Sequence, residues 1–409
     1  MKNFYQTLLE RGFIEQATDP EEMEDLFATK PVTAYNGFDP TANSLHVGHL
    51  IPVMALTHLQ QHGHRPIALV GGGTALIGDP SGKTEMRPVL SHEEIRENAE
   101  GLKKQLSRYM TLDGQKGCLL NNMDWLAPLN YIEFLRDIGR HFSVNRMLAA
   151  ESVKQRLETG LSFIEFNYQL LQAFDFLHLY SQHDCLLQMG GADQWGNIVA
   201  GADLIRRITG GKAYGLTFPL IVTSSGEKMG KTAKGAVWLD PDRTSPYEYY
   251  QFWINTEDQD VGRFLALFTF LPMDQIQSLS QKKGADLREV KEILALEATA
   301  ITHGRVEAEK ARETSRGLFY GQGLEMDSVP TSFIAKEKLD QGLEAYLLLV
   351  EAGVCQTRGE ARRLIGQGGV TLNDQRIPSF DLKIDPHHLK DNTLLLKIGK
   401  KRFHKIISS

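Results

Sequence analysis

The sequence predicts an α/β protein built on a parallel sheet, followed by an α-helical domain and a small α+β domain. Three observations favour this class. Short apolar segments run directly into glycines, at 67–70 and at 185–189, as strands buried in a parallel sheet do. Segments with helical spacing separate them. The pattern becomes mainly helical from 246 to 320, and the charge changes sign after 342.

The first part of the chain alternates helix and strand. Leu50–Gln61 has apolar residues at helical spacing and stops before Gly63. The strand at 67–70 follows, and the strand at 185–189 precedes a helix that extends through Ile208. Helices of this length between strands imply a parallel sheet, whose ligands bind beyond the carboxyl ends of the strands.

The later elements have clear signals as well. Val290–Arg316 is rich in Ala and Glu and nearly free of Gly and Pro, which predicts one long helix. Thr357–Glu360 has the pattern of a capping box that opens a helix, and a strand is expected from Val370. The segments 394–398 and 403–407 predict a hairpin whose turn, 399–402, is basic.

These signals divide the chain into five parts, with a joint near 321–338 that is rich in Gly, Ser and Pro. The expected parts are an α/β domain at 1–225, a mobile loop and connector at 226–245, an α-helical domain at 246–320, a linker at 321–342 and a small domain at 343–409.

Composition limits the class of protein further. Hydrophobic residues make up 42% and charged residues 23% of the chain, which excludes an intrinsically disordered protein. No stretch approaches the roughly 18 apolar residues of a membrane span, and Glu10, Arg11 and Glu15 argue against a signal peptide. Three widely spaced cysteines fit a reducing compartment and argue against a disulfide framework or a zinc site. We therefore expect a cytoplasmic protein.

The net charge is misleading as an average. A value of −6, from 45 Lys+Arg and 51 Asp+Glu, argues against a nucleic-acid partner. The last 67 residues, however, hold 11 Lys+Arg and 7 Asp+Glu, a net charge of +4, which leaves −10 for the preceding 342 residues. The opposite signs indicate different tasks for the two parts.

Two glycine-rich segments resemble nucleotide motifs but do not match them. Gly78–Thr84 would need a glycine at position 77 to form a phosphate-binding P-loop, and that residue is Ile77. Gly71–Gly78 has Leu76 where the dinucleotide fingerprint needs its third glycine. The sequence therefore supports neither a P-loop ATPase nor an NAD enzyme.

Two other segments do indicate phosphate chemistry. His46-Val-Gly-His49 precedes the helix at 50–61, and its histidines, three residues apart, would face the same way. A helix N-terminus favours phosphates, although such a pair can also be plain surface or part of a metal site. Ser224–Thr232 is a polar loop carrying Lys228 and Lys231, which could neutralise a leaving polyphosphate or simply be solvated.

Together, HVGH and KMGKT resemble the two signatures of class I aminoacyl-tRNA synthetases, in order and in separation. Further segments resemble the tyrosyl-tRNA synthetase family of bacteria, and the resemblance covers essentially the whole chain. Two departures are Val47 in place of the usual Ile, and KMGKT where the class pattern is KMSKS, so that Gly230 lacks a hydroxyl. The matching segments are Ala34–Thr41, Ile77–Lys83, Phe166–Gln172, Gly190–Asn197, Ala236–Pro241 and Tyr250–Asn255.

The resemblance implies an ATP-dependent tyrosine–tRNA ligase. It makes 1–225 a Rossmann-like catalytic domain that binds ATP and tyrosine, 226–245 the mobile signature loop with its connector, and 246–320 a helical domain on the anticodon side of the tRNA. Such an enzyme joins L-tyrosine to ATP, giving tyrosyl-adenylate and pyrophosphate, and then transfers tyrosine to the 3′-terminal adenosine of tRNA(Tyr). ATP is a substrate, with Mg²⁺ held mainly by its phosphates and no dedicated protein metal site. The resemblance also implies a homodimer, without a membrane partner.

The resemblance assigns two sets of residues to ATP. The residues expected to stabilise the phosphates during catalysis are Thr41, His46, His49, Lys83, Arg87, Lys228 and Lys231. Those expected to contact the nucleotide besides these are Gly37, Asp39, Gly48, Gly191, Asp193 and Thr232, with Gly37 and Gly191 permitting close backbone approach.

A second set is assigned to tyrosine. Tyr35 and Asp175 match the pair at the phenol oxygen, and Asp79, Tyr168 and Gln172 match the group around the ammonium, with Gln188 nearby. The spacing of 168, 172 and 175 independently places those three on one helix face.

The basic tail resembles an S4-type RNA-binding domain, a module that binds structured RNA by shape and by phosphates. Plain solubility charge is the alternative. The residues expected to contact tRNA are Arg358, Arg362, Arg363, Lys400, Lys401 and Arg402.

Two rival hypotheses remain. A tryptophanyl relative has the same fold, but Tyr35 and Asp175 are more polar than an indole pocket needs. A non-catalytic RNA-binding or regulatory protein could keep the fold without activity, and the intact HVGH motif and the two loop lysines argue against it.

Overall fold

The computed structural model describes residues 2–81, 90–150, 153–154, 156–157, 160–224, 226, 229–232, 235–320, 329–399 and 402–409, with the backbone alone at 231–232 and 318–320. It divides into two compact units. The first comprises Met1–Thr244 and Phe252–Gly304, and the second comprises Ser245–Gln251 and Arg305–Ser409. The finer domain boundaries expected from the sequence remain predictions.

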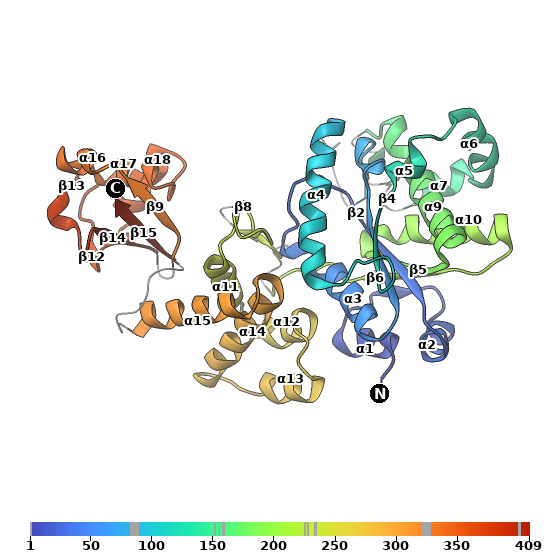
Figure 1. The fold of residues 1–409 in the computed structure, drawn as a ribbon, viewed down its shortest axis with the longest axis horizontal. Coiled ribbons are helices and arrows are strands. Elements are labelled where there is room, and N and C mark those ends of the chain that lie inside the picture. Colours follow the sequence, from blue (N-terminus) through green and yellow to red (C-terminus); the bar gives the residue numbers. More distant parts are fainter. Residues whose placement is uncertain are drawn as a thin grey trace. The chain divides into compact units, whose positions relative to one another are not determined.

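In the described part of the first unit, a six-stranded sheet has the order β1-β6-β5-β2-β3-β4. Figure 1 labels β2, β4, β5 and β6 of this sheet. Every neighbouring pair is parallel except β1 with β6, which confirms the predicted parallel sheet and adds an antiparallel edge. The strands are β1 Gln16–Ala17, β2 Thr33–Phe38, β3 Arg65–Val70, β4 Cys118–Asn121, β5 Cys185–Gly191 and β6 Tyr214–Phe218.

Helices pack on this sheet. The predicted helix at 50–61 is α3 (Leu50–Gln61), which contacts β2, β3 and β5. The one predicted after β5 is α10 (Trp195–Thr209), which packs against α9 (Phe163–His183). The remaining helices up to His303 do not all contact the sheet, and α11 is divided between the two units. They are α1 Phe4–Arg11, α2 Pro20–Thr29, α4 His92–Tyr109, α5 Met123–Leu126, α6 Tyr131–Asp137, α7 Val144–Ala149, α11 Pro246–Ile254, α12 Val261–Phe268, α13 Met273–Ser280 and α14 Asp286–His303, with a short hairpin of β7 Lys231–Thr232 and β8 Gly235–Ala236.

The packing and the strand order of this sheet indicate where a ligand would bind. Tyr35 of β2 and Leu69 of β3 lie in one buried cluster with Leu170, Ala173 and Phe176 of α9. The connection after β2 leads to β3 on one side, whereas β5 pairs with β2 on the other side and leads on to β6. Ligands of open α/β sheets bind where the strand order reverses in this way, so the carboxyl ends of β2 and β5 are the expected location of the site.

The prediction of one long helix over Val290–Arg316 was wrong. α14 ends at His303, and α15 (Arg305–Tyr320) begins after Gly304, whose φ of 90° and ψ of 154° are not helical. A residue without a Cβ adopts this conformation at little cost, so a single glycine separates two segments that otherwise share a composition typical of helix.

Arg11 fixes α12 to the N-terminal helix. Its buried guanidinium donates hydrogen bonds to the carbonyl oxygens of Ala266 (2.8 Å), Thr269 (2.9 Å) and Leu271 (2.6 Å). These carbonyls lie in and after the last turn of α12, where backbone acceptors lack helical partners. The side chain therefore acts as a C-terminal cap supplied from a distant part of the chain.

We expect Arg11→Ala to lower the free energy of unfolding of the first unit by about 2–4 kcal/mol, because it leaves buried carbonyls without donors. Urea unfolding followed by tryptophan fluorescence measures this change. Lys2→Ala is the control, since its ion pair with Glu10 is exposed. A midpoint that moves no further for Arg11→Ala than for this control would contradict the capping role.

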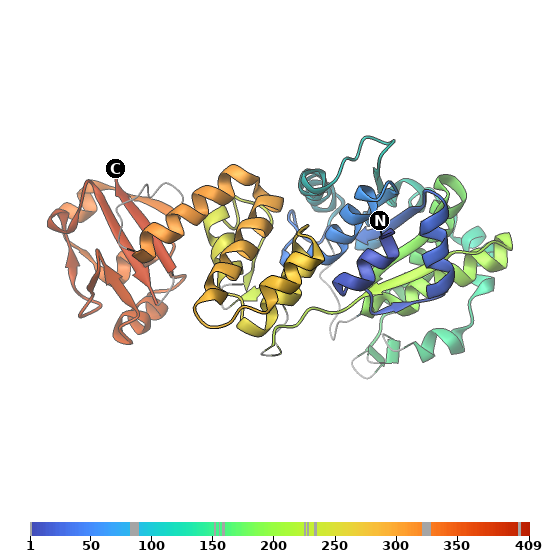
Figure 2. The ribbon, with the colours of Figure 1, turned by 90° about the horizontal axis from the view of Figure 1, so that it is seen from below.

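The second unit contains an antiparallel sheet with one parallel edge. In its described residues the order is β12-β11-β14-β15-β9, and only β15 with β9 is parallel. Figure 2 shows these strands side by side, in orange and red. The elements are β9 Thr331–Ile334, α16 Lys336–Asp340, β10 Leu343–Glu344, α17 Ala345–Glu351, α18 Arg358–Gly366, β11 Val370–Leu372, β12 Gln375–Arg376, β13 Lys383–Ile384, β14 Thr393–Ile398 and β15 Arg402–Ser408.

The local predictions for this unit are confirmed with one change. β14 and β15 form the expected hairpin, and Ile398 pairs with Arg402 across its turn. The Thr357 hydroxyl accepts the backbone N–H of Glu360, as a capping box requires. The Glu360 carboxylate, however, accepts the N–H of Gln356 instead of that of Thr357 (2.9 Å), so the box is offset by one residue.

Among the residues described, no helix has both the length and the apolar composition needed to cross a bilayer.

Candidate active site

A cavity of about 800 Å³ opens at the carboxyl ends of β2, β3, β5 and β6. Its lining includes Gly37 and Asp39 from the end of β2, Gly71 after β3, and Gly190 and Gly191 at the end of β5. It lies where the strand order predicts a ligand site. The candidate residues that line it are Tyr35, Gly37, Asp39, Thr41, His46, Gly48, His49, Asp79, Tyr168, Gln172, Asp175, Gln188, Gly191 and Asp193.

The two histidines of HVGH form one end of the cavity. The ring centroids of His46 and His49 lie 4.0 Å apart, which confirms that they face the same way. The segment Val47–His49 is a 3₁₀ turn that leads into α3, and His46 caps it by accepting the N–H of Gly48 (3.1 Å). The pair therefore lies at a helix N-terminus, where the free N–H groups favour phosphate.

Gly48, which is expected to contact the nucleotide, has a second structural reason to be glycine. A Cβ built at this position would lie 2.8 Å from Cε1 and 2.9 Å from Nδ1 of the His46 ring. The glycine therefore also leaves room for the His46 ring to turn back and cap the helix.

Asp175 and Tyr35 lie together in the buried part of the cavity. Both are almost fully buried, and the Tyr35 hydroxyl has no hydrogen-bond partner among the described residues. Asn122 Nδ2 and Trp125 Nε1 donate to the two Asp175 oxygens, at 2.9 Å and 2.7 Å. Burial raises the pKa of Asp175 to about 7. A fixed carboxylate beside an unpaired phenol can recognise a further hydroxyl.

A second buried carboxylate, that of Asp79, also lines the cavity. Asp79 accepts the Ser81 N–H at 2.9 Å and the Gln194 side-chain amide at 2.7 Å. Burial raises its pKa to about 6. When ionised, this carboxylate is a partner for a cationic group such as an ammonium.

The helix face predicted from spacing is confirmed. Tyr168, Gln172 and Asp175 all project from α9 into the cavity. The Tyr168 hydroxyl donates to Asp39 Oδ2 at 3.2 Å, and Gln172 accepts from Asn197 at 3.0 Å. Through these bonds the helix face meets two hydrogen-bonded sets of the cavity, one that includes Asp39 and one that includes Asn197.

Asp39, Asp193 and Gln188 occupy different environments. Asp39 also accepts the Thr74 hydroxyl at 3.0 Å, and a Cβ on Gly71 would lie 2.1 Å from its Oδ1, so that glycine leaves space for the carboxylate. Asp193 is exposed, as suits a contact to a sugar hydroxyl. Gln188 is buried, and its Oε1 has no partner among the described residues.

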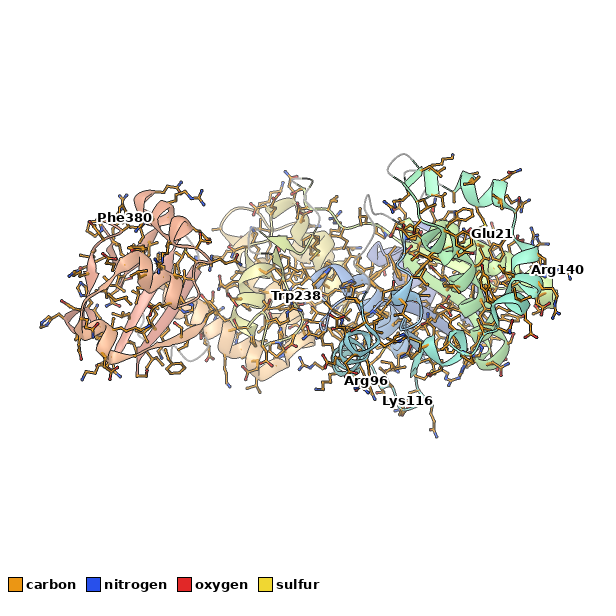
Figure 3. The ribbon with its side chains drawn as sticks, turned by 90° about the horizontal axis from the view of Figure 1, so that it is seen from above. Glu21, Arg96, Lys116, Arg140, Trp238 and Phe380 are labelled. Atoms are coloured by element: carbon orange, nitrogen blue, oxygen red, sulfur yellow. The ribbon has the colours of Figure 1, made fainter. Side chains whose placement is uncertain are left out.

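Sequence reasoning missed several residues that hold the candidate ones in place. Asn122 and Trp125 come soon after β4, at the end of a parallel sheet where ligands bind. Their position after a strand is the sequence feature that could have identified them as site residues. Gln194 and Asn197 lie in the matching segment Gly190–Asn197, but the sequence analysis assigns neither of them a role. Trp238, labelled in Figure 3, also lines the cavity, and its ring meets that of His46 edge to face at 5.9 Å.

Some candidate residues cannot be placed. Lys83, Arg87, Lys228, Lys400 and Lys401 lie outside the described residues, and for Lys231 and Thr232 only the backbone is described, as β7.

The basic residues of the second unit form a separate group. Arg358, Arg362 and Arg363 are exposed on α18. The Arg362 guanidinium lies over the rings of Tyr346 (4.2 Å) and Phe380 (5.4 Å), the latter labelled in Figure 3. Arg402 begins β15. An Arg held on aromatic rings keeps its outer face available for phosphate or base.

Comparisons with known proteins identify the family of this chain. Residues 28–320 match the family model described as tRNA synthetases class I (W and Y). The chain is 58% identical to a tyrosine–tRNA ligase of Desulfatibacillum aliphaticivorans, covering 100% of this chain and 99% of that protein. The chain belongs to the tyrosine–tRNA ligase family. Residues 323–406 match a second model, the tyrosine–tRNA ligase SYY-like C-terminal domain. A tyrosine–tRNA ligase of Caldanaerobacter subterraneus is 52% identical over 98% of both chains.

Solved structures extend the comparison. A C-terminally truncated mitochondrial tyrosyl-tRNA synthetase of Aspergillus nidulans superimposes with a TM-score of 0.71 at 33% identity, covering 78% of this chain and 95% of that one. A tryptophanyl-tRNA synthetase of Encephalitozoon cuniculi reaches 0.56 at 14% identity, covering 75% of this chain and 87% of that one. This second likeness shows a shared fold alone. The tyrosine–tRNA ligases match the whole chain at much higher identity, which decides against the tryptophanyl rival.

Proposed function

We propose that this chain activates L-tyrosine with ATP and transfers it to the 3′-terminal adenosine of tRNA(Tyr). The observation that carries the proposal is the buried pair of Asp175 and Tyr35 in a cavity whose other end bears His46 and His49. One end suits a phenol and the other suits phosphates. The names of the relatives support the same activity.

In the first step, the tyrosine carboxylate attacks the α-phosphorus of ATP. A bond forms between the carboxylate oxygen and phosphorus, the bond to the bridging oxygen of the β-phosphate breaks, and pyrophosphate leaves. The substrate supplies the nucleophile, so the protein acts by positioning and by stabilising charge. His46 and His49 would serve the phosphates from the helix N-terminus, with Thr41 beside them and the lysines of KMGKT closing over pyrophosphate.

Tyrosine itself would be held at two points. The Asp175 carboxylate accepts the phenol hydroxyl, with the Tyr35 hydroxyl as second partner. Asp79, Tyr168 and Gln172 surround the ammonium. A site that hydrogen-bonds a hydroxyl rejects the analogue lacking it, because its buried polar groups would stay unpaired.

Mg²⁺ would be held mainly by the ATP phosphates. Asp39 and Asp79 already accept hydrogen bonds on both carboxylate oxygens, and the described residues contain no cluster of three or more His, Cys, Asp or Glu suited to a metal. Bound there, the ion would offset the charge of the departing pyrophosphate.

Tyrosine binding should weaken in acid. Burial raises the pKa of Asp79 to about 6, so the carboxylate is ionised above that pH and neutral below it, where it no longer attracts an ammonium. We expect the tyrosine dissociation constant to rise by up to about tenfold per pH unit below 6. Equilibrium dialysis between pH 5 and 8 measures it. The Asp79→Asn variant should bind tyrosine more weakly and should lose the part of this dependence that lies below pH 6, whereas the part near pH 7 that Asp175 causes should remain. An unchanged dependence below pH 6 in that variant would contradict the assignment.

We further propose that the second unit binds tRNA as an S4-like domain. The exposed arginines of α18 and the basic hairpin turn support this, together with the positive charge after residue 342. Structured RNA is bound by such groups through its phosphates and its shape. The acceptor end of the tRNA would then enter the cavity of the first unit.

We also propose a homodimer formed through the surface between α6 and the start of α9. Large apolar side chains are exposed there to an extent that a lone soluble protein seldom shows. Ile132 is 70%, Phe163 69% and Val144 58% exposed. A second copy of this chain is the proposed occupant. The other exposed apolar residues of this surface are Tyr131, Leu135, Leu148, Leu157 and Ile164.

Phe163→Asp should convert the dimer to a monomer, because it places a charge in an apolar interface. Sedimentation equilibrium should give twice the chain mass of 45.9 kDa for the unaltered protein and the single mass for the variant. Leu9→Asp is the control, since Leu9 is also exposed (59%) but lies on α1. Equal masses for the two variants would contradict the proposed interface.

The complete reaction is tested by charging. Purified protein, ATP, labelled tyrosine and a tRNA(Tyr) transcript should yield acid-precipitable tyrosine that depends on all three substrates. Binding of tRNA without any charging would favour the regulatory, non-catalytic alternative.

A further inference from the structure

We propose that Val47 and Gly230 form the contact that positions the KMGKT loop against the HVGH turn. Val47 acts as a positioning residue, and position 230 is limited to glycine because Val47 occupies the space of a side chain. This inference rests on the proposed function, in which the loop serves pyrophosphate.

Backbone hydrogen bonds through Val237 join the two motifs, and a further bond holds the start of the loop to the segment before it. Before it, the Met229 N–H donates to the Ile221 carbonyl at 3.0 Å. After it, the Val237 N–H donates to the Gly230 carbonyl at 3.0 Å, and Val237 in turn accepts the Val47 N–H at 2.9 Å. One continuous set of bonds therefore links Gly230 to the HVGH turn.

The closest approach is between Gly230 and Val47. A Cβ on Gly230 would lie 2.5 Å from Val47 Cγ2 and 3.3 Å from the Gly48 nitrogen. Val47 is 1% exposed, so its β-branched side chain has little room to turn away. The φ of Gly230 is +84°, which also favours glycine. The space that Val47 occupies and the positive φ therefore both favour glycine at position 230.

The contact between Val47 and Gly230 lies within the two motifs that are expected to serve the phosphates. Val47 lies between His46 and Gly48, and Gly230 immediately precedes β7, which begins at Lys231. The separation of the two backbones at this point fixes how far the loop lies from the histidine end of the cavity. Forcing them apart should slow activation. Tyrosine affinity should not change, because neither Val47 nor Gly230 lines the cavity that holds Asp175 and Asp79.

Gly226 provides a matched control for backbone strain. Its φ is +85°, nearly that of Gly230, but a Cβ built on it meets nothing within 4 Å. Gly226→Ala therefore carries the cost of the left-handed conformation alone, whereas Gly230→Ala carries that cost and the clash with Val47.

The test is the single-turnover rate of tyrosyl-adenylate formation, with the tyrosine dissociation constant measured in parallel. Gly230→Ala should be slower than Gly226→Ala by about tenfold or more, since it alone overpacks a buried contact. Adding Val47→Ala to Gly230→Ala should recover part of that loss, and Val47→Ala by itself should be slowed less than Gly230→Ala. Tyrosine affinity should stay within about threefold throughout.

Equal rates for the two alanine variants, or no recovery in the double variant, would overturn the inference. So would a loss of tyrosine affinity parallel to the loss of rate. If the unaltered protein formed no adenylate from tyrosine, that result would contradict the proposed function. The rate of the unaltered protein therefore tests the function, and the rates of the variants relative to it test the contact.

Discussion

Asp175→Asn should lower kcat/KM for tyrosine by about 100-fold, because a hydrogen bond to a charged group contributes roughly 1.5–3 kcal/mol. Phenylalanine, which lacks the phenol, should be affected far less, so discrimination between the two amino acids should collapse. Asp175 is well placed for this effect. It is 2% exposed, and Asn122 and Trp125 orient its two oxygens. An amide there would direct its NH₂ group at one of these two donors.

The measurement is amino-acid-dependent ATP–pyrophosphate exchange with tyrosine and phenylalanine at several pH values. Because burial raises the pKa of Asp175 to about 7, the carboxylate that accepts the phenol is lost as the pH falls through that value. Discrimination in the unaltered protein should therefore decline in acid. Asp203→Asn is the control, since that carboxylate pairs with Arg206 and Arg207 away from the cavity. Undiminished discrimination in Asp175→Asn would refute the role of this residue.

Ending the chain after residue 320 should abolish charging and preserve activation. Every residue that lines the cavity lies between Tyr35 and Trp238, and the buried cluster of the second unit is built from Ile334 to Ile406. The removed part carries the positive charge. We expect exchange to change less than about threefold and charging to fall by about 100-fold or more, since several phosphate contacts are lost together.

A double substitution tests the role of the positive charge without removing the folded second unit. Arg358→Ala with Arg363→Ala removes two exposed cations and spares Arg362, which packs on Tyr346. Charging by this variant should weaken and depend less steeply on salt. Unchanged charging by the truncated chain would remove the role assigned to residues 343–409.

Local pattern predicted local structure well. The helix Leu50–Gln61, the strand at 67–70 and the hairpin at 394–407 follow from periodicity and turn residues, which depend on near neighbours. The break at Gly304 was missed because composition on its two sides is alike. The antiparallel edge strand was missed because Gln16–Ala17 has only two residues, too few for any periodicity.

For the candidate site, too, the sequence predicted what depends on near neighbours and missed what depends on distant contacts. Tyr168, Gln172 and Asp175 share a helix, so their spacing alone indicated a common face, and resemblance supplied their roles. The donors to Asp175 come from positions 122 and 125, some 50 residues earlier, and only the folded sheet brings them close. The reasons for Gly48 and Gly230 likewise depend on contacts, with the His46 ring and with Val47, that spacing cannot show.

The most direct test of the central claim is ATP–pyrophosphate exchange by the unaltered full-length chain, with each amino acid in turn. The site predicts exchange that depends on tyrosine, with phenylalanine and tryptophan supporting little or none. Exchange with tryptophan but not tyrosine, or no exchange with any amino acid, would contradict it.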